Sequence, residues 1–183
     1  MPLTNPQGSH LGLILPLCTS SATLGLALFQ YPLFLSFLQQ PTDLSNPKSN
    51  ISGKPLSTVW STFMYTGTSV ALAITTTSAI AGLLSAQWLR THATLETTDV
   101  SKWYTYGAVL AAGHLLFVPA VGGPIGRIVE NGKGEVGSES EVERSNAEEQ
   151  KMWLVWHTVR TLTVDLGALL CFAEGAALSL WVI

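Results

Sequence analysis

One stretch of the chain limits its fold more than any other: residues 153–174, which read WLVWHTVRTLTVDLGALLCFAE. The stretch is long and apolar enough to cross a membrane as a helix, yet it carries His157, Arg160, Asp165 and Glu174. A charged side chain at the centre of a bilayer costs at least about 2.5 kcal/mol, so such groups usually face a bundle interior or one another. We therefore expect other helices to surround this one.

The composition also favours a membrane protein. Of the 183 residues, 47% are hydrophobic and 11% are charged, whereas soluble domains carry about 25% charged residues. Cys18 and Cys171 stand apart in apolar runs, without the spacing of a redox or zinc site. The net charge of −3 argues against nucleic acid as a partner. We predict a single membrane domain over residues 1–183, in contact with the lipid bilayer.

Hydropathy and helix breakers predict an all-α fold, an integral membrane four-helix bundle. The expected helices cover about residues 11–38, 58–89, 102–120 and 151–181. The sequence FVPAVGGPIG at 117–126 is expected to break the third helix and form a pocket rim. Residues 127–150 contain seven glutamates and no aromatic residue, so we expect a mobile acidic loop there.

The basic residues predict the orientation in the membrane. The first and third loops together hold six lysine and arginine residues, against Arg90 and Lys102 on the other side. Positive-inside counting places these two loops in the cytosol and both termini in the lumen. Use of the glycosylation sequon at Asn50 would reverse this orientation. The expected location of this multi-pass protein is the endoplasmic reticulum or another endomembrane.

Four ionisable residues form the candidate catalytic set: His114, His157, Arg160 and Asp165. On a helical wheel His157 and Arg160 share a face, while Asp165 lies about 140° from Arg160. Antiparallel connection of the third and fourth helices would bring His114 to nearly the depth of Asp165. Either histidine would serve as general base and Arg160 would stabilise an enolate or phenolate oxygen. Asp165 would orient a histidine or balance Arg160.

The same residues leave other roles open. Two histidines and one carboxylate match the facial triad of a non-haem iron site, although no H-x-E or H-E-x-x-H spacing is present. Arg160 and Asp165 could instead neutralise one another in a packed bundle. The alternative functions are a cofactor-free polyketide or terpenoid cyclase or isomerase, and a non-enzymatic tetraspan membrane scaffold.

Three motifs carry a family resemblance: W-x-x-W-H-T-V-R-T-L at 153–162, FVPAVGGPI at 117–125 and QYPLFLSFL at 30–38. With them, the chain resembles the fungal anthrone oxygenase-like family of small four-helix membrane proteins, formerly grouped as a domain of unknown function. The resemblance implies an oxidoreductase, a monooxygenase that converts a polycyclic anthrone to an anthraquinone in aromatic polyketide (secondary metabolite) biosynthesis. Molecular oxygen would be the co-substrate, without flavin or haem. The flat polyketide substrate could stack on Trp153, Trp156, Tyr104, Tyr106 and Phe117.

Overall fold

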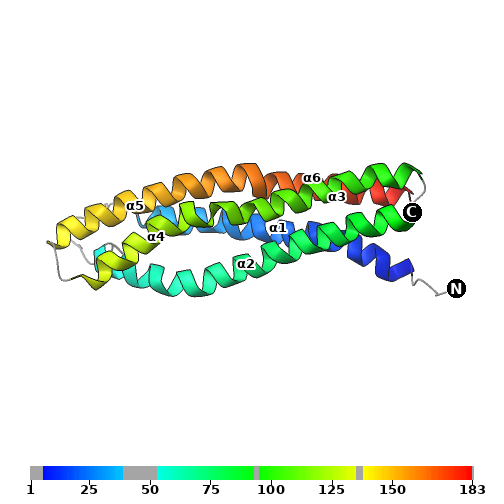
Figure 1. Cartoon of the computed structure of the whole chain (residues 1–183). Coiled ribbons are helices and arrows are strands. Elements are labelled where there is room, and N and C mark those ends of the chain that lie inside the picture. Colours follow the sequence, from blue (N-terminus) through cyan, green and yellow to red (C-terminus); the bar gives the residue numbers. More distant parts are fainter. Residues whose placement is uncertain (1–5, 39–52, 93–94, 135–137, 183) are drawn as a thin grey trace. The chain divides into compact units, whose positions relative to one another are not determined.

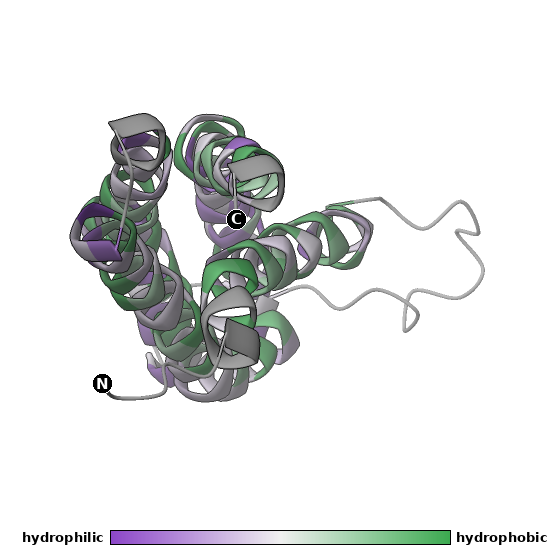
Figure 2. Ribbon diagram, turned by 90° about the vertical axis from the view of Figure 1, so that its right-hand side faces the viewer, coloured by the Kyte–Doolittle hydropathy of each residue, from purple (hydrophilic) through white to green (hydrophobic). Residues whose placement is uncertain are grey.

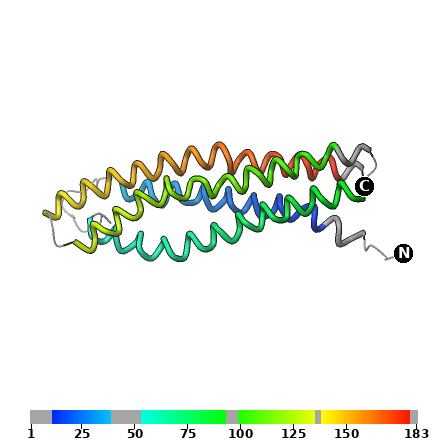
Figure 3. Tube along the Cα trace, viewed as in Figure 1, coloured from blue at the N-terminus to red at the C-terminus, as the bar shows by residue number. Residues whose placement is uncertain are grey.

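The computed structural model describes residues 6–38, 53–92, 95–134 and 138–182. All regular structure within these ranges is helical (Figure 1). The elements are α1 (Pro6–Ser36), α2 (Gly53–His92), α3 (Leu95–Gly113), the 3₁₀ segment η2 (His114–Phe117), α4 (Val118–Lys133), α5 (Glu139–Arg160), the π-helical segment η3 (Thr161–Asp165) and α6 (Leu166–Val182). The backbone runs without interruption from α3 through η2 into α4 and from α5 through η3 into α6 (Figure 3). The predicted class, an all-α membrane four-helix bundle, is confirmed.

Within the described ranges, four helical stretches are long and apolar enough to cross a membrane: Leu11–Ser36, Gly53–His92, Asp99–Lys133 and Glu139–Ser179. Apolar residues occur along all of these helices (Figure 2). Many large apolar side chains are exposed, among them Phe29, Leu116 and Leu162. Such a surface suits hydrocarbon rather than water, since monomeric soluble proteins rarely expose large apolar areas.

The described helices group into two compact units. Unit 1 comprises Met1–Gly25, Ala71–Leu116 and Arg160–Ile183, and unit 2 comprises Leu26–Val70 and Phe117–Val159. Each unit contains part of every long helix, and we describe each unit by itself. The single domain expected over residues 1–183 stays a prediction.

The core of unit 1 is built on close contacts between helices. The ring of Phe172 in α6 is fully buried and lies against Gly82 of α2 and Gly107 of α3. A Cβ atom at Gly107 would come within 2.6 Å of this ring, so only glycine permits the contact. In α1, Pro16 has no N–H for the carbonyl four residues earlier, and the Ser85 hydroxyl donates to that Gly12 carbonyl at 3.1 Å.

The core of unit 2 is aromatic. Phe34 of α1 stacks on Trp60 of α2 with ring centroids 4.4 Å apart, and Trp153 of α5 packs against both rings. The Trp60 Nε1–H donates to the buried Gln150 at 2.7 Å. The Gln150 amide also donates at 3.4 Å to the carbonyl of Phe34, near the end of α1. Helix ends need such partners because their last carbonyls have none within the helix.

The predicted acidic loop was wrong for the described residues of 127–150. Helix α4 continues to Lys133 and α5 begins at Glu139. Val142, Asn146 and Gln150 are buried at four-residue intervals, which is the spacing of one helix face. Asn146 donates to Ser57 at 3.2 Å. Because glutamate is abundant in this segment, its composition alone does not indicate the narrow buried face of the helix.

The predicted helix break at 117–126 was also wrong, because α4 is helical from Val118. Pro119 lies in the first turn of α4, where a missing N–H costs little. The segment before it, η2, tightens to 3₁₀ geometry. Ile125 and Ile128 are buried in the core of unit 2, so packing maintains the helix through the Gly and Pro residues. A pocket rim of irregular backbone is therefore absent from these described residues.

Candidate functional site

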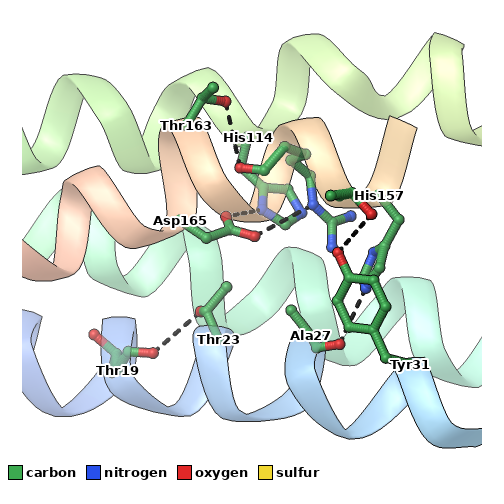
Figure 4. Close-up of polar contacts among 10 residues, drawn as sticks. Thr19, Thr23, Ala27, Tyr31, His114, His157, Thr163 and Asp165 are labelled. Atoms are coloured by element: carbon green, nitrogen blue, oxygen red, sulfur yellow. Dashed lines mark hydrogen bonds and ion pairs between the residues drawn. The ribbon is translucent and has the colours of Figure 1, made fainter. Parts of the chain in front are cut away.

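Three of the predicted residues meet inside unit 1. His114 begins η2, Arg160 ends α5 and Asp165 ends η3. The Nδ1–H of His114 donates to Oδ1 of Asp165 at 2.7 Å, and Nε of Arg160 donates to Oδ2 of the same carboxylate at 3.3 Å (Figure 4). The Asp165 and His114 side chains are 2% and 8% exposed. The expected proximity of His114 and Asp165 is confirmed.

The π-helical segment η3 aligns the last two members of this His114 cluster. Arg160 and Asp165 are five residues apart, which in an α-helix would leave them about 140° apart. In η3 the N–H of Leu166 bonds to the carbonyl of Thr161, the i to i+5 pattern of a π-helix. The widened turn brings Asp165 round to the face of Arg160. Single π turns inside α-helices occur frequently at functional sites.

The carboxylate fixes the tautomer of His114. An ionised carboxylate can only accept hydrogen bonds, so Nδ1 carries the proton and Nε2 is the basic nitrogen. Among the described residues, the hydrogen bond of the His114 side chain is made by Nδ1 and not by Nε2. This is the arrangement in which an aspartate orients a catalytic histidine. The Arg160 guanidinium balances the charge of the Asp165 carboxylate, so the cluster is formally neutral while His114 is neutral.

His157, the other predicted base, makes contacts of a different kind. Its ring is fully buried and stacks on Trp153 with centroids 4.6 Å apart. Its Nε2 lies 3.0 Å from the carbonyl of Ala27 in α1, and the ring of Tyr31 lies 4.9 Å away (Figure 4). Since a carbonyl only accepts, Nε2 donates. These contacts lie within unit 2, whereas the His114 cluster lies in unit 1, and they tie α5 to α1.

The predicted aromatic contacts are distributed over both units. Trp153 is packed into the core of unit 2, and Tyr104 is fully buried with its hydroxyl bonded to the Leu13 carbonyl at 3.0 Å. Trp156 and Tyr106 are 38% and 54% exposed on their helices. Phe117 is half-buried at the end of η2. Stacking of a substrate on any of them stays a prediction.

The donors of the cluster do not fit the iron triad. That triad needs two histidines and a carboxylate, whereas the cluster offers one imidazole, one carboxylate and one guanidinium. Over the described ranges, no three His, Cys, Asp or Glu side chains are grouped so that they could hold a metal ion.

Sequence reasoning missed two buried hydroxyls in the described part of unit 1. Thr161 is the first residue of η3 and is 1% exposed, and Thr75 in α2 is 2% exposed. Both lie in segments where threonine is common, so their identity alone gave no signal. Only the coordinates reveal that neither hydroxyl has a hydrogen-bond partner among the described residues.

The fold and the cluster together define an all-α protein whose described residues include four candidate membrane spans and, in unit 1, a buried imidazole and carboxylate bonded to a mostly buried guanidinium. Comparison with models of known protein families, with curated proteins and with solved structures finds no match.

Proposed function

We propose that the protein is an oxygenase of the anthrone oxygenase type, which oxidises a polycyclic anthrone to an anthraquinone during aromatic polyketide biosynthesis. One observation carries the proposal: Asp165 binds Nδ1 of His114 at 2.7 Å and so presents Nε2 as a base. The family resemblance of the sequence supplies the substrate class. The proposed setting is an endomembrane, and an apolar bundle within it would admit both a flat aromatic molecule and oxygen.

The proposed reaction begins with proton transfer to His114. The carbon opposite the carbonyl of an anthrone is acidic because loss of its proton gives an aromatic anthranolate. Nε2 of His114 accepts that proton, and Asp165 stabilises the resulting imidazolium as it would in a catalytic triad. Proton transfer of this kind contributes about 10²- to 10⁴-fold to a rate.

The anthranolate then reacts with oxygen. One electron passes to molecular oxygen, and the resulting radical and superoxide combine to a peroxide anion at the same carbon, which takes back the proton from His114 and becomes a hydroperoxide. The hydroperoxide loses the remaining hydrogen of that carbon together with hydroxide, which leaves as water. The sum is one anthrone and one oxygen molecule consumed, with one anthraquinone and one water formed.

The same geometry also favours a non-catalytic role, because the bonds of Asp165 to His114 and Arg160 join η3 to η2 and to the end of α5. A cyclase or isomerase would use the same base without oxygen. His114→Asn distinguishes the structural role from the catalytic one. The asparagine amide can still donate to Asp165, but it has no basic nitrogen in place of Nε2.

The test is oxygen uptake by the detergent-purified full chain with emodin anthrone, with and without a chelator. Wild type should exceed the autoxidation rate, and His114→Asn should fall to that rate while its melting temperature stays near that of wild type. His92→Asn is the matched control, since His92 is exposed at the end of α2. Wild-type uptake equal to autoxidation would refute the oxygenase. Full activity in His114→Asn would refute the role of His114 as the general base.

A further inference from the structure

Most serine and threonine hydroxyls in these helices bond to a carbonyl of the preceding turn. In α2, for example, Thr77 donates to Ala73 at 2.8 Å and Ser78 donates to Ile74 at 3.1 Å. Such bonds satisfy a hydroxyl within its own helix. Thr75 and Thr161 differ, because Oγ1 of each is buried and has no hydrogen-bond partner within the described residues. An unpaired buried hydroxyl is unfavourable, so a ligand that offers an acceptor to either hydroxyl would gain a hydrogen bond that the described residues do not supply.

The register of α2 against α3 places Thr75 near the depth of His114. Arg90 bonds to Ser101 at 3.1 Å, and eight residues earlier in α2 Gly82 packs against Ala108. The two helices are therefore antiparallel. Seven further residues along α2 lead to Thr75, and about as many along α3 and η2 lead just past His114. Both residues are buried, so they face the interior of unit 1.

The register of α3 against α6 places Thr161 at a similar depth. Gly107 packs on Phe172, and Gly113 lies opposite Val164. Thr161 is three residues before Val164, so it lies within about one helical turn of His114 along the helix direction. Thr161 also directly follows Arg160. The two unpaired hydroxyls and Nε2 of His114 thus occur in one layer of unit 1.

We propose that Thr75 and Thr161 form a binding site in unit 1 for a carbonyl oxygen of a flat aromatic ligand. The inference rests on the proposed function, in which the anthrone carbonyl becomes an oxyanion when His114 takes the proton. Each threonine hydroxyl can donate to that oxygen. The bonds strengthen as negative charge develops, which is how an oxyanion site accelerates a reaction. The two threonines thereby take the role that the sequence suggested for Arg160, whose Nε binds Asp165.

The test uses two unreactive probes, 9,10-anthraquinone, which has carbonyl oxygens, and anthracene, which has none. Their dissociation constants are measured by tryptophan quenching on the detergent-purified full chain. Thr75→Val and Thr161→Val keep the side-chain shape and remove the hydroxyl. Each should weaken anthraquinone about 5- to 15-fold, the value of one hydrogen bond, and leave anthracene unchanged. Thr77→Val, at an exposed and internally bonded position, should change neither constant.

Serine variants keep the test decisive if a valine variant fails to fold. Thr75→Ser and Thr161→Ser retain the hydroxyl and should bind anthraquinone as wild type does. An unchanged ratio of the two dissociation constants in the folded valine variants would overturn the site, as would equal weakening of both probes. Failure of wild type to bind anthraquinone more tightly than anthracene would overturn it too.

The proposed threonine binding site and the proposed oxygenase activity can be refuted independently of one another. Binding of anthraquinone that depends on the threonines, without oxygen uptake from emodin anthrone, would support the site and refute the oxygenase. Oxygen uptake that depends on His114, with an unchanged binding ratio in the valine variants, would support the oxygenase and refute the site.

Discussion

Replacement of Asp165 by asparagine should destabilise unit 1 strongly. The side chain keeps its shape but loses the charge that balances Arg160, and the Arg160 side chain is only 11% exposed. Removing one partner of a buried ion pair leaves an uncompensated charge and costs about 3–5 kcal/mol. For a chain of this size, 1 kcal/mol corresponds to about 2–4 °C in melting temperature. We therefore expect a decrease of roughly 6–20 °C.

The assay is thermal unfolding in detergent followed by circular dichroism. Asp99→Asn is the matched control, because the Asp99 side chain is 80% exposed and pairs with Lys102 at 3.3 Å. An exposed pair of this kind contributes less than about 1 kcal/mol. Adding Arg160→Gln to Asp165→Asn removes the cation whose charge the carboxylate had balanced and should restore part of the loss. Equal melting temperatures for Asp165→Asn and Asp99→Asn would refute the conclusion that Asp165 and Arg160 form a buried ion pair that stabilises the fold.

Three further predictions concern packing and helix extent. Gly107→Ala places a Cβ 2.6 Å from the Phe172 ring and should lower stability by about 1–3 kcal/mol in thermal unfolding, an expectation refuted by a wild-type melting curve. Ser85→Ala leaves the Gly12 carbonyl, which Pro16 cannot bond, without its donor at 3.1 Å. The free energy of unfolding should fall by about 1–3 kcal/mol, and an unchanged value would mean that water replaces the hydroxyl. Hydrogen exchange should show protected amides around Asn146, and Asn146→Ala should reduce that protection more than Glu143→Ala; rapid exchange in wild type would argue for a loop.

The fold class could be predicted because four long apolar runs leave few alternatives to membrane helices. The helix ends could not, because hydropathy marks the length that suits the bilayer rather than the length of the helix. The fourth helix was expected from residue 151, but α5 begins at Glu139. What maintains the additional turns is a buried polar face with Asn146 and Gln150, and polar residues on such a face resemble those of a solvated loop.

The candidate site could be predicted in part. Depth in the membrane was enough to predict that His114 lies near Asp165. The two residues are at similar distances in sequence from the connection between their antiparallel helices, so they occur at the same depth. The wheel calculation failed for Arg160 and Asp165, because it assumes α-helical geometry throughout. No residue in TLTVD identifies a π turn, so its position depends on tertiary contacts. The sequence also ranked His157 with His114, although the two histidines have different hydrogen-bond partners.

The π turn of η3 has a consequence for how this chain tolerates changes in length. A five-residue π turn and a four-residue α turn both complete about one revolution of the backbone, so each leaves the helix beyond it in nearly the same phase. Deleting the exposed Leu162 would therefore convert η3 to α-helix while Arg160 still faces Asp165. Deleting one residue within α6 would instead rotate the remainder of that helix by about 100° and turn its buried face away from the core. A one-residue deletion therefore has different effects along the continuous helix of α5, η3 and α6. Between Arg160 and Asp165 it should leave the rest of the helix correctly oriented, because the π turn there can become an α turn.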